Sequence, residues 1–294
     1  MAKTREIRNR LKSVASTMKI TRTMEMVATV RSKRAQDRLK GALPFYRHLA
    51  DMAGRLMAAQ EGDEVLHPLF RRPARPKKTI LLLLTADRGL CGGYNANAFQ
   101  AGKEEFRRLE KEGREIEFHV SGKKGISYFR FLGWTMQKTL TGIDDKVRYE
   151  QIDALAGAYI DRFLSGEVDE VRVVGFRYLS ASRQVPRTFR LLPVEPAAPK
   201  EEAAGAGEGL AYDFLPSASS ILEELVPFEV KTALFTRFLE AGASEQIARR
   251  VAMKLATDNA EEMMKTLRQR YNRARQTQIT TELTDIMGGA AAIH

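Results

Sequence analysis

Cysteine and histidine are scarce in this 294-residue chain, which contains one cysteine and four histidines. The single Cys91 cannot form an intramolecular disulfide, and the histidines lack the spacing of zinc ligands. No nucleophile elbow or metalloprotease motif occurs in the sequence. We therefore predict that the chain holds no metal and no cofactor, and that it supplies no catalytic residue.

Long apolar runs are also missing. The longest, residues 80–84, is far shorter than the roughly 20 residues that a membrane-spanning helix needs. No apolar stretch with a cleavage site follows Met1, so no secretory signal is expected. Hydrophobic residues make up 44% of the chain and charged residues 29%. That balance is typical of a folded globular protein.

Positive charge is abundant and unevenly placed. The formal net charge is +11, and residues 1–55 contain 14 Lys and Arg against 4 Asp and Glu, a net charge of +10. Such asymmetry indicates one basic surface that faces an acidic partner. Nucleic acid is one such partner, but no aromatic residue precedes Phe45, so this segment offers no platform on which bases could stack. An acidic protein partner and a solvated helix face are the other two open interpretations.

The N-terminal region predicts one long helix over residues 5–57, rich in good helix formers and free of turn clusters. Steps of four and three separate its apolar residues, as in a coiled coil. We expect the phase of this seam to shift midway, to Ile20, Met24 and Val27, and the helix to kink at Pro44. The two in-phase runs are Ile7, Leu11, Val14, Met18, and then Ala35, Leu39, Ala42, Tyr46, Leu49, Ala53, Leu56.

A second long helix is predicted over residues 228–287, with Pro227 at a position where a helix can begin. At about 1.5 Å per residue, each helix would be on the order of 80–90 Å long. Each needs a partner to cover its seam, and only the other helix has a matching length. Because a domain separates them in sequence, we expect them to run antiparallel. The expected C-terminal seam is Ile247, Val251, Ala260, Met264, Leu267, Tyr271 and Ala274.

Between these helices, short apolar blocks alternate with helical segments, which predicts βαβ units and a mostly parallel sheet. The predicted fold class is an antiparallel coiled coil of N- and C-terminal helices with an inserted Rossmann-like α/β domain. Strands are expected at residues 79–85, 115–120, 171–178 and 187–192, and helices at 98–112, 123–132 and 151–164. The expected parts are a helix over 1–58, a linker over 59–78, the α/β domain over 79–192, a flexible loop over 193–211 and a helix over 212–294.

A glycine-rich segment, residues 85–95 (TADRGLCGGYN), follows the first predicted strand and precedes a helix, where phosphate-binding loops occur. Its glycine spacing matches neither the dinucleotide-binding motif nor the P-loop, and no Lys-Ser/Thr pair follows. A second segment, residues 121–125, fails in the same way. We therefore favour a tight turn over a nucleotide site. The alternative is that the chain is an NTP-binding α/β enzyme, and that function would depend on this loop.

Separated motifs carry a resemblance to a known family. Residues 5–14 (REIRNRLKSV), 19–28 (KITRTMEMVA) and 33–36 (KRAQ) resemble the N-terminal helix of the gamma subunit of F-type ATP synthases. Residues 87–95 (DRGLCGGYN) are similar to that family's central motif, and residues 279–290 (ITTELTDIMGGA) to its C-terminal signature. Residues 244–249 and 253–260 are similar as well, so the resemblance extends over the whole chain in order.

The resemblance implies a non-catalytic central rotor shaft that couples proton-driven rotation of a membrane c-subunit ring to ATP synthesis or hydrolysis. Its implied partners are the alpha, beta and epsilon subunits and that ring, with ATP, ADP and Mg at the alpha and beta subunits. Its implied location is peripheral, on the cytoplasmic face of a bacterial plasma membrane, with no nucleic acid bound. The alternative function is a basic coiled-coil adaptor for nucleic acid.

Site residues are likewise implied by the resemblance. Met24, Arg249 and Gln276 stand at positions that contact the beta subunit in the family. The implied basic contact residues are Arg8, Arg10, Lys12, Lys19, Arg22, Arg31, Lys33 and Arg34. The motif residues are Asp87, Arg88, Gly89, Gly92 and Gly93 in the α/β domain, and Ile279, Thr280, Glu282, Asp285, Gly289 and Ala290 in the C-terminal signature.

Overall fold

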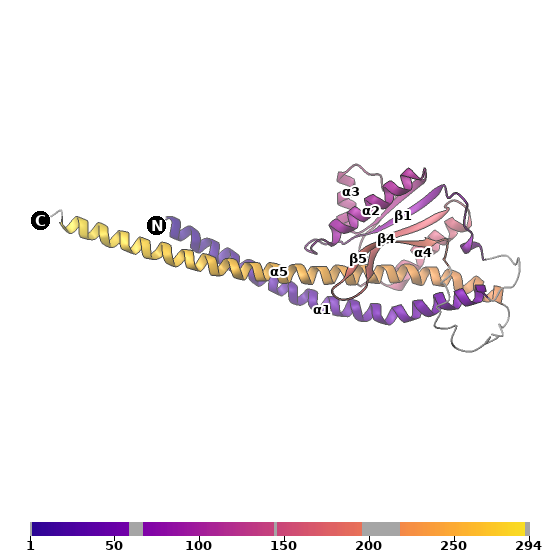
Figure 1. The fold of residues 1–294 in the computed structure, drawn as a ribbon, viewed down its shortest axis with the longest axis horizontal. Coiled ribbons are helices and arrows are strands. Elements are labelled where there is room, and N and C mark those ends of the chain that lie inside the picture. Colours follow the sequence, from indigo (N-terminus) through magenta and orange to yellow (C-terminus); the bar gives the residue numbers. More distant parts are fainter. Residues whose placement is uncertain (1, 59–66, 144–145, 196–217, 292–294) are drawn as a thin grey trace. The chain divides into compact units, whose positions relative to one another are not determined.

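The computed structural model describes residues 2–58, 67–143, 146–195 and 218–291 (Figure 1). The chain divides into two compact units, Met1–Val30 with Arg249–His294, and Arg31–Ala248. The two long helices contribute to both units. The elements are α1 (Ala2–Ala58), η1 (Pro68–Phe70), β1 (Lys78–Leu84), α2 (Tyr94–Lys111), β2 (Glu115–Ser121), α3 (Lys123–Phe131), β3 (Lys138–Leu140), α4 (Tyr149–Leu164), β4 (Glu170–Tyr178), β5 (Gln184–Leu192) and α5 (Ala218–Ala291).

A five-stranded sheet in the order β3-β2-β1-β4-β5 forms the centre of the Arg31–Ala248 unit. The pairs β1–β2, β1–β4 and β2–β3 are parallel, whereas β4 and β5 pair antiparallel at one edge. Both faces of β1 are covered, which explains why its sequence is a continuous apolar run without polar alternation. The predicted Rossmann-like, mostly parallel sheet is confirmed.

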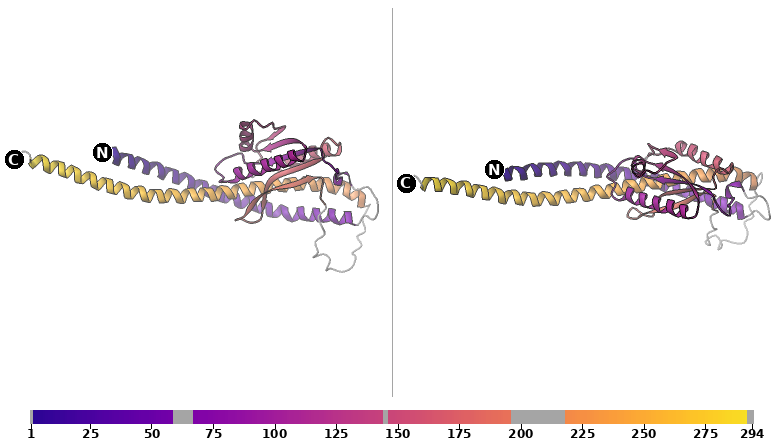
Figure 2. Two further views of the ribbon diagram at one scale, coloured as in Figure 1. Left: turned by 45° about the horizontal axis from the view of Figure 1, so that its top comes forward. Right: turned by 90° about the horizontal axis from the view of Figure 1, so that it is seen from above.

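Each face of the sheet has its own hydrophobic cluster. Leu81 and Leu83 of β1 pack with residues of α2 and α3. Ile80 and Leu82 of the same strand pack on the other face, with α4 and with the parts of α1 and α5 that belong to this unit. Figure 2 shows α2 and α4 on opposite sides of the strands. The alternation of side chains along one buried strand therefore separates the two clusters.

Three parts of the α/β region differ from the expected pattern. Strand β3 was not predicted, because three residues are too short to show a pattern, and β5 begins at Gln184 rather than residue 187. Within the range expected to be a linker, η1 places Leu69 and Phe70 in the core. The Val194 amide donates to the Leu69 carbonyl at 2.9 Å. Of the loop expected over 193–211, residues 196–211 lie outside the described part of the chain.

The other unit is an antiparallel pair formed by the ends of α1 and α5. Its orientation follows from two contacts: Thr4 Oγ1 lies 2.8 Å from Gln278 Oε1, and Thr21 Oγ1 lies 3.0 Å from Thr257 Oγ1. Figure 1 shows both chain ends at the same end of this unit. The antiparallel pairing predicted from the sequence is confirmed here.

The predicted phase shift of the α1 seam is wrong. Ile20 is 60% exposed and Val27 is 50% exposed. Thr21, Glu25 and Ala28, which keep the original phase, are half-buried or buried, and Met24 beside Glu25 is half-buried as well. Polar side chains at two of the in-phase positions concealed the repeat. The in-phase positions of α1, all of them buried or half-buried, are Thr4, Ile7, Leu11, Val14, Met18, Thr21, Glu25, Ala28, Ser32, Ala35, Leu39, Ala42, Tyr46, Leu49, Ala53 and Leu56.

The predicted start of the second helix also needs correction. Helix α5 begins at Ala218, and Pro227 lies inside it, as Pro44 lies inside α1. Val251, expected in the C-terminal seam, is 48% exposed. The other expected seam residues of α5 in this unit are buried or half-buried. With Met253, Thr257 and Gln278 they give the series Met253, Thr257, Ala260, Met264, Leu267, Tyr271, Ala274 and Gln278.

Candidate functional site

The basic residues of the first turns of α1 point away from its seam. Arg8, Lys12, Lys19 and Arg22 are exposed, and so is Arg10, whose guanidinium lies 2.9 Å from the Glu6 carboxylate. Such an exposed i,i+4 pair contributes only about 0.3–0.5 kcal/mol to stability, so it does not hold the Arg10 side chain rigidly in place. This part of α1 therefore presents a cationic face to any surrounding molecule.

The remaining basic residues named from the resemblance belong to the Arg31–Ala248 unit. There Lys33 and Arg34 are exposed, whereas Arg31 is half-buried and interacts within the chain. The eight residues therefore do not form one uniform patch. Arg31 sits next to the seam position Ser32, and the helical twist turns Lys33 and Arg34 outward.

The other two named positions on α5 differ from each other. Arg249 is only 9% exposed and is engaged within the chain, whereas Gln276 is exposed. Met24 of α1 is half-buried, one position before the seam residue Glu25. Contact of Arg249 with an acidic partner would thus occur through a small accessible edge of its side chain. The Gln276 side chain is exposed, so its contact with a partner would not be limited in this way.

The C-terminal signature is helical, and its described side chains are exposed. Every residue from Ile279 to Gly288 is exposed, including Thr280, Glu282 and Asp285. The hydroxyl of Thr280 donates to the Gln276 carbonyl at 3.0 Å, and Gln278 Nε2 donates to Glu282 Oε1 at 2.8 Å. The exposure of Gly289 and Ala290 is not among the described features. From Ile279 to Gly288 the signature is therefore an exposed surface of α5.

The central motif makes a tight turn that its own side chains support. The Asp87 carboxylate accepts hydrogen bonds from the backbone amides of Lys123 at 2.9 Å and Gly142 at 3.0 Å. Gly92 has φ 55°, a left-handed conformation that glycine adopts at little cost. Gly93 is the N-cap residue of α2. These contacts favour the turn that we predicted over a nucleotide-binding loop.

Neighbouring residues of the motif are also occupied within the fold. Asn95 Oδ1 accepts from the Ala86 amide at 3.0 Å, and Asn95 Nδ2 lies 3.2 Å from the sulfur of Cys91, which is buried. Arg88 and Gly89 interact within the chain as well. The motif thus joins the carboxyl end of β1 to the segments that follow β2 and β3.

Sequence reasoning missed a buried ionic cluster on the sheet. Glu170 is 3% exposed, and its carboxylate contacts three guanidinium groups, those of Arg114, Arg172 at 2.7 Å and Arg190 at 3.0 Å. Arg172 also lies 2.9 Å from Glu105. The strand register brings these residues together, so no single stretch of sequence carries the signal. This cluster is a structural feature that fixes β4 and β5.

A second polar cluster surrounds His119 on β2. Its Nδ1 lies 3.0 Å from the Tyr159 hydroxyl, and burial lowers the pKa of His119 to about 4. Beside it, the Arg162 guanidinium lowers the pKa of Glu117 to about 2 through two hydrogen bonds. Near neutral pH the histidine is therefore neutral and the carboxylate is charged. These groups therefore interact with one another within the fold.

Among the described residues, no three or more His, Cys, Asp or Glu side chains form a group that could hold a metal ion. Within the same residues, no helix is long and apolar enough to cross a membrane.

Comparison with known proteins identifies the family. The family model described as ATP synthase matches residues 3–293. The ATP synthase gamma chain of Gemmatimonas aurantiaca is 41% identical over 296 aligned residues that cover 100% of both chains, and that of Leptospira biflexa is equally identical with the same coverage. The chain belongs to the ATP synthase gamma chain family.

Solved structures of similar fold come from more distant relatives. The rotor of the Euglena gracilis mitochondrial ATP synthase has a chain that is 18% identical with a TM-score of 0.63, covering 95% of this chain and 99% of that one. A chain in the central stalk and c-ring of the Tetrahymena thermophila mitochondrial enzyme is 21% identical with a TM-score of 0.56, covering 81% and 99%. At this identity the likeness supports the fold, which agrees with the paired helices and inserted sheet described above.

Proposed function

We propose that this chain is the central rotor shaft of a bacterial F-type ATP synthase, and that it couples proton-driven rotation to ATP synthesis or to the reverse hydrolysis. The observation that carries the proposal is full-length membership of the gamma chain family, combined with a continuous heptad seam in α1. A chain that needs no chemistry of its own fits a shaft, because a shaft transmits force and does not bind substrate.

The paired ends of α1 and α5 have the physical properties that torque transmission requires. Interlocked seam residues must deform before one helix can turn relative to the other, because packed interiors have low compressibility. Torque applied to one part of the pair is thus passed along it. The exposed residues differ from one side to the other, so each surrounding subunit would meet a different surface and be biased toward a different conformation.

The exposed cationic residues would contact acidic surfaces of the alpha and beta subunits. Arg8, Lys12 and Arg22 are free of seam packing, and Gln276 is equally accessible. The exposed C-terminal signature of α5 would turn inside the ring that these subunits form. ATP, ADP and Mg would be bound by the alpha and beta subunits, and this chain would be a non-catalytic subunit.

The epsilon subunit and the membrane c-subunit ring complete the proposed partners. One of the similar solved chains comes from a structure of the central stalk and c-ring of another ATP synthase, which supports this arrangement. The chain would therefore be peripheral to the membrane, on the cytoplasmic face of the bacterial plasma membrane. A nucleic-acid adaptor gains no support from the fold. The basic residues of α1 lie mostly before Phe45, in a stretch that contains no aromatic side chain on which bases could stack.

Direct observation of rotation tests the proposal. Cys91 is buried, so a single exposed cysteine, Glu110→Cys on α2, can carry a specific probe. The labelled chain is assembled with alpha and beta subunits that are fixed to a surface. We expect unidirectional rotation of the probe when ATP is added, and only thermal fluctuation without ATP.

A probe that stays still in an assembled complex that hydrolyses ATP would overturn the proposal. The matched control places the cysteine on an alpha subunit, where the same label should not rotate. Failure of the chain to co-purify with alpha, beta and epsilon subunits from cells would count equally against it.

A further inference from the structure

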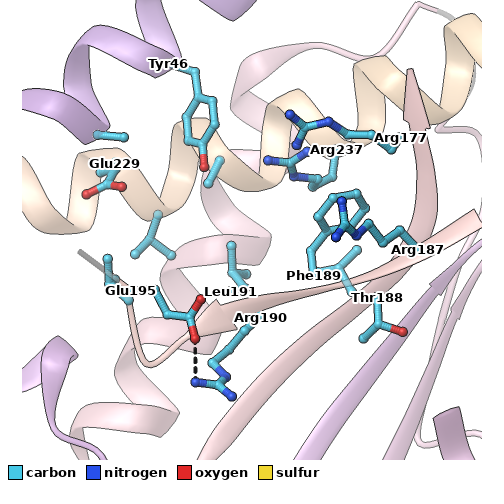
Figure 3. A pocket seen from close by; sticks show the side chains of 15 residues that line it. Tyr46, Arg177, Arg187, Thr188, Phe189, Arg190, Leu191, Glu195, Glu229 and Arg237 are labelled. Carbon is cyan, nitrogen blue, oxygen red and sulfur yellow. Dashed lines mark hydrogen bonds and ion pairs between the residues drawn. The ribbon is translucent and has the colours of Figure 1, made fainter. Parts of the chain in front are cut away.

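A cavity of about 440 Å³ lies within the Arg31–Ala248 unit, between α1, the β4–β5 edge of the sheet and α5. Its volume falls in the range of pockets that hold small organic ligands. Tyr46 comes from α1, Phe189 from β5, and Glu229 from α5 (Figure 3). The rotor function proposed above makes no use of this cavity.

One end of the cavity is cationic. Arg177, Arg187 and Arg237 line it, and Figure 3 shows their guanidinium groups around Phe189. The Arg237 guanidinium carbon lies 4.1 Å from the centre of the Phe189 ring, which holds this side chain in place. Arg237 is therefore held in position before any ligand arrives, whereas Arg187 is exposed.

The positive charge at this end exceeds the negative charge that balances it. Arg177 Nε lies 3.7 Å from the Glu240 carboxylate, which Arg237 also contacts, so two arginines share one acid. Among the described residues, Arg187 has no ion-pair partner. Arg190, which lines the cavity as well, is balanced by Glu170 and Glu195. At least one guanidinium is thus available to an anion.

The other end of the cavity contains an unsatisfied acid. Glu229 is 6% exposed, and its Oε2 makes no hydrogen bond within the described structure. Figure 3 shows its carboxyl group facing the cavity across from Glu195. Burial raises the pKa of Glu229 to about 7, so near neutrality much of it is uncharged and does not repel an anion. A buried polar atom without a partner costs stability unless a ligand supplies one.

We propose that this cavity binds a small phosphomonoester, whose phosphate contacts Arg177, Arg187 and Arg237 and whose hydroxyl group hydrogen-bonds to Glu229. Guanidinium groups suit this ligand because their planar donors match two oxygens of a phosphate at once. Glu229 and the guanidinium groups lie on opposite sides of the cavity in Figure 3, so a ligand with a carbon portion can contact both. The carbon portion of the ligand would pack beside Tyr46.

Titration calorimetry on the full chain tests the proposal, with glycerol 3-phosphate and inorganic phosphate as probes at pH 7 and constant ionic strength. We expect glycerol 3-phosphate to bind, and to bind more tightly than inorganic phosphate, because only the ester reaches Glu229. Arg187→Gln should weaken binding about tenfold, since it removes charged hydrogen bonds to phosphate. The matched control is Arg183→Gln, an exposed arginine of the same hairpin that does not line the cavity.

Several results would overturn the proposal. Absence of binding heat with the ester is one, and equal weakening by Arg183→Gln and Arg187→Gln is another, because it would indicate general charge attraction. Equal affinity for the ester and for inorganic phosphate would show that Glu229 does not contact the ligand. Glu229→Leu, which replaces the acid by an apolar side chain of similar size, should abolish the preference for the ester while phosphate binding persists.

Discussion

The hydroxyl oxygens of Thr21 and Thr257 lie 3.0 Å apart across the antiparallel helix pair, although 236 residues separate them in the sequence. Thr257 is 7% exposed, and its neighbours in the seam are mostly apolar. A buried polar pair of this kind specifies register, because a shift of one helix along the other would leave both hydroxyls without each other.

Replacement of Thr257 by Val keeps the shape of the side chain and removes its hydroxyl. We expect a loss of about 1 kcal/mol in the free energy of unfolding, because Thr21 then lacks its cross-helix partner. In a double-mutant cycle with Thr21→Val, the two losses should be less than additive. Urea unfolding followed by circular dichroism measures both. Thr23→Val, which removes an exposed hydroxyl bonded only to the Lys19 carbonyl, is the control, and strict additivity would argue against the pair.

Reversal of charge on α1 tests the proposed contact with acidic subunits. We expect Arg8→Glu combined with Lys12→Glu to lower proton pumping per ATP hydrolysed in membrane vesicles, because like charges would then face each other. Both side chains are exposed, so the fold should be retained. The control pair, Arg107→Glu with Lys111→Glu, has the same i,i+4 spacing on the exposed face of α2. Equal proton pumping per ATP hydrolysed in the two double variants would contradict a role for the basic face of α1.

The ionic cluster at Glu170 should be sensitive to loss of its acid. Glu170→Gln leaves the guanidinium groups of Arg114, Arg172 and Arg190 without their shared carboxylate in a buried place. We expect the free energy of unfolding to fall by about 3–5 kcal/mol. Asp258→Asn breaks the exposed pair with Lys254 and should cost less than about 0.5 kcal/mol. Similar losses in the two variants would mean that the cluster contributes no more than a surface pair.

Two glycines offer opposite outcomes for the same substitution. A methyl group at Gly125 would lie 2.5 Å from Thr85 Oγ1 and 2.8 Å from a Val120 methyl carbon, so Gly125→Ala should destabilise the chain by about 1–3 kcal/mol. Gly41 lies inside α1 with nothing within 4 Å of the added atom. Gly41→Ala should therefore stabilise the helix by roughly 0.5–1 kcal/mol. Melting temperatures give both signs, and destabilisation by Gly41→Ala would refute the second expectation.

The buried Glu229 should make stability depend on pH. Its pKa rises from 4.5 in the unfolded chain to about 7 in the fold, because burial disfavours the charged form. The unfolded chain thus loses this proton first as pH increases, and stability falls between about pH 4.5 and pH 7, by about 3 kcal/mol in total. Glu229→Gln should remove this part of the pH dependence in phosphate-free buffer. The free energy of unfolding is measured at pH 5 and pH 8 for the wild-type chain and for Glu229→Gln. An equal difference between the two pH values in both proteins would contradict this role of Glu229.

Much of the architecture could be predicted because burial leaves a direct pattern. The apolar run of β1 indicated a strand covered on both faces, and Leu39 and Leu49 showed the heptad spacing of α1. The middle of the same seam was misread, because Thr21 and Glu25 are polar and the more apolar Ile20 and Val27 lie outside. In a helix pair a small or polar residue can be covered by its neighbours, which hydropathy does not register.

The clusters in the α/β region could not be predicted for a different reason. Glu170 meets Arg190 only because β4 and β5 pair in one particular register, and Glu229 lines the same cavity as Arg187 only because α5 packs beside that edge. Contacts between distant segments depend on three-dimensional placement that no local spacing encodes. The burial of Arg249 belongs to the same class. The partner contacts of the basic residues remain predictions.

The last stretch of α5 has a consequence for how the chain meets its surroundings. From Ile279 to Gly288 every residue of the helix is exposed, and about ten residues in water form a helix only marginally by themselves. Its backbone amides should exchange with deuterium within seconds in the isolated chain and slowly once the tip is enclosed. The conformational entropy of this segment is therefore lost when the complex assembles and not when the chain folds. That loss weakens the binding of the tip to its partners and leaves the stability of the isolated protein unchanged.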